Sequence, residues 1–194
     1  MNLLFPTIRW KYIPPIVGIA LLGAVIAGFY GILHDQITYS ISPEYFTKLK
    51  FHQFHYANFG FPVRIFVGEV GFLATWWVGI FSGWFLARIA VPAWPLHTAL
   101  KNCLIGFGII FGFAILAAII GYCLGLRHSS DYSNWEDLGS TLGVTDISDF
   151  VRAAYIHNAS YIGGLVGLIA AIITLMIQRS QTGKPIRFKL KANG

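Results

Sequence analysis

YIPPIVGIALLGAVIAGFYGIL, residues 12–33, is an uncharged apolar run, and the polar stretch HDQITYSISPEYF, residues 34–46, follows it directly. The run is long enough to cross a hydrocarbon core of about 30 Å as a single helix. Ionisable groups are costly in lipid, so we expect His34, Asp35 and Glu44 in water or at a site lined by protein. This boundary predicts a membrane-spanning helix that ends in a polar region.

A cleavable signal peptide is the alternative interpretation of this first run. The small residues around Val25-Ile26-Ala27 resemble a cleavage site. The apolar run is longer than the usual stretch of about 7–15 residues, which favours a retained helix.

The composition extends the membrane interpretation to the whole chain. Of its 194 residues, 56% are hydrophobic and 11% are charged, whereas soluble domains carry roughly 25% charged residues. We predict an all-α, polytopic transmembrane helix bundle that forms one integral membrane domain over residues 1–194. Its four spans are expected at about 12–33, 65–87, 102–124 and 153–177.

The first outer connection is expected to contain a short interfacial helix. Ser42 is suited to cap it, and Pro43 fits its first position. Apolar and basic residues alternate along the following segment, which is typical of a helix lying at a membrane surface: Phe46, Lys48, Leu49, Lys50, Phe51 and Phe54.

Three spans carry glycine pairs four residues apart, a spacing that lets helix backbones approach closely in lipid. Packing within the bundle is favoured over a dimer interface. The pairs are Gly79 and Gly83, Gly108 and Gly112, and Gly163 and Gly167.

The charges are distributed unevenly between the two sides of the predicted bundle. Nine of the fourteen Lys and Arg residues lie in the leader, the middle turn and the tail. The positive-inside rule therefore places both termini in the cytoplasm. All eight acidic residues lie on the other side or just inside it, which marks the outer end as the candidate working end: Asp35, Glu44, Glu69, Asp131, Glu136, Asp137, Asp146 and Asp149.

The ends of all four helices meet at that outer end, and each supplies a histidine or an acidic residue that could bind a metal ion. Helix bundles build metal sites from His and carboxylate side chains of facing helices, and such sets suit Zn, Cu or Fe. We therefore predict a transition-metal site with residues of a second layer around it. The predicted ligands are His34, Asp35, Glu69 and His157. The residues expected around them are Glu44, Asn158 and Tyr161. The third span brings His128 to this end, as a weaker candidate.

Each of these residues has a structural alternative. His34 could cap the first helix, and Asp35 could be solvated. Glu69 could form a salt bridge with Arg64, and His157 could be hydrogen-bonded to Tyr161, one turn away. Glu44 is also favourable at a helix N-terminus without any further role.

Two classes of function stay open. The first is a membrane protein with this metal site at the outer, periplasmic mouth of the bundle, with or without enzymatic activity. The second is a non-catalytic accessory or scaffold subunit that binds other membrane proteins through its outer loops. Membrane lipid is a partner in both cases. No nucleic-acid partner is expected, because the basic tail fits juxtamembrane positive charge.

HDQITYSISPEYFT, residues 34–47, resembles an uncharacterised bacterial four-span membrane-protein family with an HDQ-T...EYFT signature after its first span. ATWWVGIFSG, residues 74–83, resembles the family's second span, and HNASYIGGLVG, residues 157–167, its last. The resemblance implies a bacterial inner-membrane location and singles out residues 34–36, 44–46, 76–77, 157–158 and 161. It implies no catalytic role. The family usually has a short His-Pro stretch where this chain has Lys48 to His55.

Overall fold

Four long helices dominate the computed structural model, which describes residues 8–127 and 132–181. They are α1 (Ile13–Ile41), α3 (Val63–Ala90), α4 (Leu96–Arg127) and α6 (Ile147–Gln181). Each is long and apolar enough to cross a membrane. No strand occurs among the described residues. The predicted all-α, four-span architecture is confirmed, and the chain is an integral membrane protein by this criterion. His128, a weaker candidate from the sequence, lies outside the described residues.

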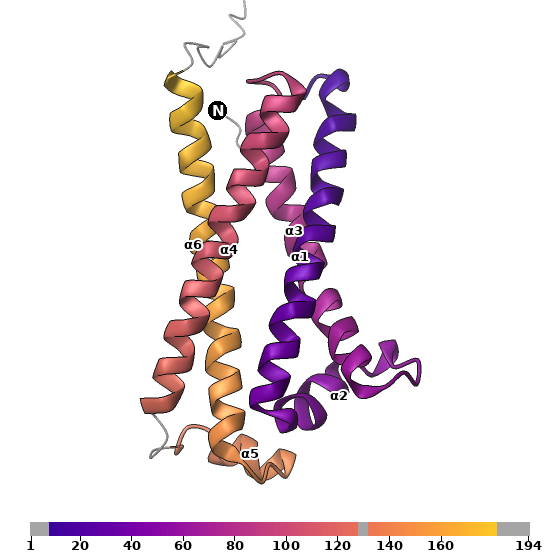
Figure 1. The fold of residues 1–194 in the computed structure, drawn as a ribbon, viewed down its shortest axis with the longest axis vertical. Helices are drawn as coiled ribbons and strands as arrows, with labels where there is room; N and C mark the ends of the chain where they lie inside the picture. The colour runs from indigo at the N-terminus through magenta and orange to yellow at the C-terminus, as the bar shows by residue number, and fades with distance from the viewer. Residues whose placement is uncertain (1–7, 128–131, 182–194) are drawn as a thin grey trace, which may run out of the picture.

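The four helices run antiparallel in chain order (Figure 1). The start of α1 and the end of α6 lie at one end of the bundle, and the end of α1 and the start of α6 lie at the other. This second end also carries the short elements, so polar connections gather there. They are η2 (Tyr45–Lys50), α2 (Phe51–Gln53), η3 (His55–Ala57) and α5 (Glu136–Leu142), whereas η1 (Trp10–Tyr12) leads into α1.

Each helix is longer than its predicted span, and α1 shows why. It continues through the polar stretch to Ile41, and its last backbone bond is donated by Ser42 to the Thr38 carbonyl. Pro43 follows, and a residue before proline is disfavoured in the helical conformation. The apolar run therefore ends two turns before the helix does, and His34 and Asp35 are carried on a rigid helix.

The helices pack in two intimate pairs, α1 with α3 and α4 with α6. A Cβ atom added to Gly79 would lie 2.7 Å from the Ala27 Cβ, and one added to Gly163 would lie 2.6 Å from the Phe113 backbone oxygen. Only glycine permits backbones this close. In contrast, Gly108 and Gly112 have open space where a Cβ would stand. Two of the three predicted glycine pairs therefore hold the bundle together, and the third does not.

The outward faces of the helices remain apolar. Leu33 is 66% exposed and Leu165 is 61% exposed, and large apolar side chains recur along the outer faces of all four helices. Soluble proteins rarely expose continuous apolar surface on this scale. Lipid is the environment that these faces require.

The predicted short helix after the first span is present as η2 and α2, but its first half is not simply laid on the surface. Phe46 has no exposed surface, and Lys50 is only 5% exposed. Phe46 packs with Tyr45, Val67 and Phe150 in an apolar cluster. The η2 segment has π-helical hydrogen bonding and inserts into the same end of the bundle as His34 and Asp35.

Candidate metal centre

The ends of α1 and α6 bring together three of the predicted site residues. His34 and Asp35 lie on α1, and His157 lies on α6. One ligand atom from each lies within 4.8 Å of the others. The two imidazole rings meet edge to face with centroids 4.6 Å apart. This group therefore joins the two helix pairs, since α1 belongs to one and α6 to the other.

Short polar contacts hold both rings. His34 Nδ1 lies 3.2 Å from Asp35 Oδ1, and His34 Nε2 lies 3.1 Å from the Ser160 hydroxyl. His157 Nε2 lies 3.1 Å from the Thr38 hydroxyl and 3.9 Å from Asp35 Oδ1. The other ring nitrogen of His157 is buried without a hydrogen-bond partner. Asp35 Oδ1 is thus the atom toward which both imidazoles converge.

Lys50 supplies the counter-charge for Asp35. Its ammonium lies 3.2 Å from Asp35 Oδ2 and 3.5 Å from Oδ1, and both side chains are almost fully buried. Burial lowers the pKa of Lys50, while the Asp35 carboxylate acts in the opposite direction. A buried carboxylate needs such a partner, because an isolated charge in an apolar interior is very unfavourable.

Aromatic rings enclose the group. Tyr45 from η2 stacks on His157 with centroids 4.9 Å apart, and Phe46 lies edge-on at 6.1 Å. Tyr30 approaches His34 from one turn earlier in α1, at 5.7 Å. These rings exclude water, so electrostatic interactions inside the group are stronger than they would be at the surface.

The spacing of the three ligand atoms fits a small metal ion. Nitrogen and oxygen ligands bind zinc at about 2.0–2.1 Å, which places neighbouring ligand atoms of a tetrahedral site roughly 3.4 Å apart. Asp35 Oδ1 lies 3.2 Å from His34 Nδ1 and 3.9 Å from His157 Nε2. The three ligand atoms lie within 4.8 Å of one another, so a bound ion would draw the two imidazoles closer together. A set of two imidazoles and one carboxylate suits zinc, iron or copper.

The structure places Glu69 elsewhere. It lines a separate cavity between α3, η3 and the end of α1, and its Oε2 is buried without a hydrogen-bond partner. The salt bridge to Arg64 that the sequence offered as an alternative is not formed. Arg64 instead donates to the Gln36 carbonyl and side chain and to the Ser40 hydroxyl.

The three residues expected around the site also have other environments. Glu44 accepts bonds from the backbone amides of Thr145 and Asp146, at 3.0 and 2.7 Å, and so holds the connection that leads into α6. Asn158 is exposed. Tyr161 is 53% exposed, with its ring 6.1 Å from that of His157. Of the three, Tyr161 alone borders the group, and its place there is at the periphery.

Four contributing residues were given no role in the site from the sequence, although the family resemblance covers the first two: Thr38, Tyr45, Lys50 and Ser160. Helical spacing could have identified two of them. Thr38 lies three residues after Asp35, and Ser160 lies three after His157, so each shares a face with its neighbour. Lys50 carried no such signal, because lysine is almost never fully buried without a partner and the partner lies on another helix.

Comparison with known proteins does not add a function to this geometry. The chain matches no protein-family model, no curated protein and no solved structure.

Proposed function

We propose that the protein is an integral membrane protein that binds a transition-metal ion, zinc, copper or iron, between α1 and α6. Its ligands are His34, Asp35 and His157. The observation that carries the proposal is the short approach of His34 Nδ1 to Asp35 Oδ1, at 3.2 Å.

The hydrogen-bond network favours a proton or a cation between His34 Nδ1 and Asp35 Oδ1. The Ser160 hydroxyl donates its hydrogen to the Ile156 carbonyl, so toward His34 Nε2 it acts as an acceptor. His34 Nε2 therefore carries the proton, and a neutral ring then has a bare lone pair at Nδ1. That lone pair faces a carboxylate oxygen. A proton or a metal ion between the two atoms relieves the repulsion. The Thr38 hydroxyl donates to the His34 carbonyl, so His157 Nε2 carries a proton toward Thr38. For Nε2 to serve as the third metal ligand, that proton would move to Nδ1.

The surroundings support metal binding at Asp35 Oδ1. Lys50 sits closer to the other carboxylate oxygen, Oδ2, and so holds the side chain in place while Oδ1 faces the imidazoles. Ser160 orients His34 through the nitrogen that would not bind the ion, as partners of metal-ligating histidines commonly do. A metal ion bound there would supply Lewis acidity toward an oxygen-containing ligand.

Metal-dependent stability of the purified protein tests this proposal. The thermal unfolding midpoint in detergent is measured while Zn(II), Cu(II) or Fe(II) is added. A ligand at about 100 times its dissociation constant stabilises a protein by about 2.7 kcal/mol. We expect a rise for at least one metal in the wild type. His34→Ala and His157→Ala should fold without showing that rise.

His52→Ala is the matched control, since His52 lies at the same end of the bundle but is exposed. It should respond to metal like the wild type. A wild-type protein that ignores all three metals would contradict the proposal.

A second candidate is a non-catalytic accessory subunit in which this group is only a structural junction. It is favoured by the Lys50–Asp35 ion pair, which already neutralises the carboxylate. In that case metals leave the unfolding midpoint unchanged, while His157→Ala still lowers it, because the ring fills a buried space between α1 and α6.

We also propose that both termini are cytoplasmic, in the inner membrane of a bacterium, and that the metal site lies at the outer end. The excess of Lys and Arg in the leader, middle turn and tail supports this orientation. A reporter fused after Gly194 should be active in the cytoplasm, and one fused near Ser133 should be active outside. An external signal from the fusion after Gly194 would reverse the assignment.

A further inference from the structure

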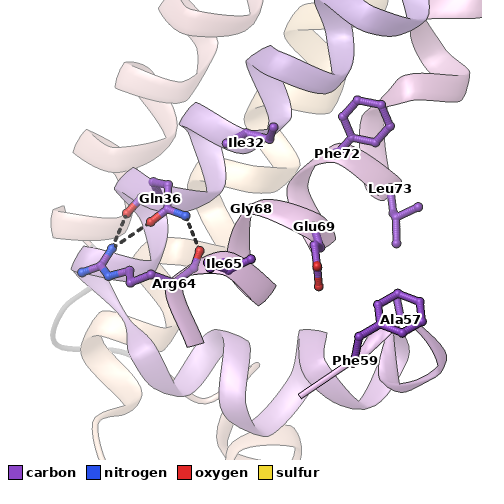
Figure 2. Close-up of a pocket in the computed structure, with 10 residues that line it drawn as sticks. All are labelled: Ile32, Gln36, Ala57, Phe59, Arg64, Ile65, Gly68, Glu69, Phe72 and Leu73. Atoms are coloured by element: carbon purple, nitrogen blue, oxygen red, sulfur yellow. Dashed lines mark hydrogen bonds between the residues drawn. The ribbon is translucent and has the colours of Figure 1, made fainter. Parts of the chain in front are cut away.

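The cavity lined by Glu69 has a volume of about 570 Å³ and opens beside α3, at the end of the bundle that carries the proposed metal site (Figure 2). None of the three proposed metal ligands lines it. Its walls are largely apolar and come from α1, η3, the following loop and α3: Ile32, Ala57, Phe59, Ile65, Phe72 and Leu73. This volume is in the range of cavities that bind small molecules.

One carboxylate stands among these apolar walls. Figure 2 shows Glu69 extending from α3 into the space above Phe59 and Ala57. Its Oε2 is buried and has no hydrogen-bond partner. An unsatisfied carboxylate oxygen is costly in such surroundings, so the cavity is built around an acceptor that lacks a donor.

The neighbouring polar side chains do not supply that donor. Figure 2 shows Arg64 and Gln36 bonded to each other and directed away from Glu69. The Gln36 amide nitrogen donates to the Arg64 carbonyl at 2.7 Å. The Arg64 guanidinium lies over the Tyr39 ring, 4.6 Å from its centroid. These contacts commit both side chains to fastening α1 to α3.

The position of the cavity indicates what reaches it. Glu69 lies six residues after the start of α3, a rise of about 9 Å along the helix. Phe59 is 74% exposed and Ile65 is 51% exposed, so the rim is apolar and faces outward. A ligand that enters here must carry an apolar body through an apolar rim and place a hydrogen-bond donor at the Glu69 carboxylate.

We propose that this cavity binds an amphiphile with a protonated primary amine as its head. The ammonium donates to Glu69 Oε2, and the hydrocarbon chain lies against Ile65, Phe72 and Leu73. A quaternary ammonium has the charge but no N–H group, and an alcohol has a donor but no charge. Both therefore bind more weakly than the primary amine. This site is independent of the proposed metal site.

Calorimetric titration of the purified full-length protein with dodecylamine, in dodecyl maltoside micelles, tests the proposal. Dodecylamine should bind saturably. Dodecanol and dodecyltrimethylammonium, which share its chain, should each bind at least about tenfold more weakly. Equal affinity for dodecanol and dodecylamine would overturn the proposal, because the chain alone would then explain binding.

Two variants locate the binding. Glu69→Gln keeps the size of the side chain and should weaken dodecylamine binding at least about tenfold, whereas Glu136→Gln, at an exposed acid of α5, should not change it. Ile65→Trp fills part of the cavity while keeping the carboxylate, and should also abolish binding. Undiminished affinity in Glu69→Gln or in Ile65→Trp would place the amine elsewhere and refute the proposal.

The source of the amine is distinguished by mass spectrometry of the protein extracted from membranes. Phosphatidylethanolamine that stays bound to the wild type and is lost from Glu69→Gln identifies a lipid headgroup as the natural ligand. Dodecylamine binding without any retained phosphatidylethanolamine identifies a free long-chain amine instead. Either result supports the amine site.

Discussion

The contacts within each helix pair differ from the contact between the pairs. Inside α1–α3 and α4–α6, glycines such as Gly79 and Gly163 let backbones touch, and in the first pair Thr75 also donates to the Ala27 carbonyl. At the end that carries the short elements, α1 and α6 meet through two imidazoles, beside the ion pair of Asp35 with Lys50 of η2. Elsewhere the pairs meet in an apolar cluster that includes Leu86, Phe107 and Leu175. Small residues suffice to pack helices in lipid, so the polar junction is not needed for packing. Its buried charges are the basis of the metal site proposed above.

Removal of Lys50 should give the largest loss of stability among the variants proposed here. Lys50→Met leaves the Asp35 carboxylate buried without its counter-charge and should reduce the free energy of unfolding by about 3–5 kcal/mol. Unfolding in mixed micelles with increasing denaturing detergent measures this loss. Lys48→Met, in the same segment but only half-buried, should change stability by no more than about 0.5 kcal/mol.

A double replacement sharpens the same comparison. Lys50→Met combined with Asp35→Leu removes both charges, and an apolar pair in place of a buried ion pair is often neutral. The double variant should therefore recover most of the stability lost in Lys50→Met, yet should show no metal response. A double variant as unstable as Lys50→Met would mean that the ion pair is not what stabilises this junction.

Gly163→Leu tests the packing within a pair. A side chain there meets the α4 backbone near Phe113 and Ala114, so we expect a loss of about 1–3 kcal/mol through overpacking. Gly108→Leu is the matched control, because the same change meets open space. Equal thermal midpoints for both variants would show that the Gly163 face does not pack as described.

The smallest effect is expected at Glu44. Hydrogen bonds from the Asp146 amide and the Thr145 hydroxyl and amide hold the pKa of Glu44 below its usual value of 4.5. A lowered pKa in the folded state contributes stability that is present above pH 4.5 and is lost as the pH falls through the folded-state pKa. Glu44→Gln should remove this part of the acid dependence. The thermal unfolding midpoint of Glu44→Gln, measured from pH 3 to pH 7, should therefore vary less than that of the wild type.

The helices could be predicted from the sequence because long uncharged runs have few other solutions in a membrane. Their ends could not, since the helical conformation continues through polar residues. In α1 it ends only at Ser42, before Pro43. The exposed apolar faces likewise follow from composition, whereas the open environment of Gly108 depends on how α4 is rotated.

The proposed site was predictable only in part, for geometric reasons. His34, Asp35 and His157 were assigned to one end from the order of helices and polar residues, and they do meet. Glu69 was assigned with them, but the rotation of α3 directs it elsewhere. Gly71 faces Asp35, and Glu69, two residues earlier, lies about 200° away around the helix. The buried position of Lys50 beside Asp35 depends on the insertion of η2 into the bundle, and no periodicity in the sequence indicates that insertion.

X-ray absorption spectroscopy of the metal-loaded protein tests the proposed metal centre most directly. For one bound ion per chain, we predict two imidazole nitrogens and carboxylate oxygen at about 2.0–2.2 Å. The spectrum of His157→Ala should show one imidazole fewer, and that of His52→Ala should be unchanged. A wild-type spectrum without imidazole ligands, or one that His157→Ala does not alter, would contradict the assignment of His34, Asp35 and His157 as a metal site.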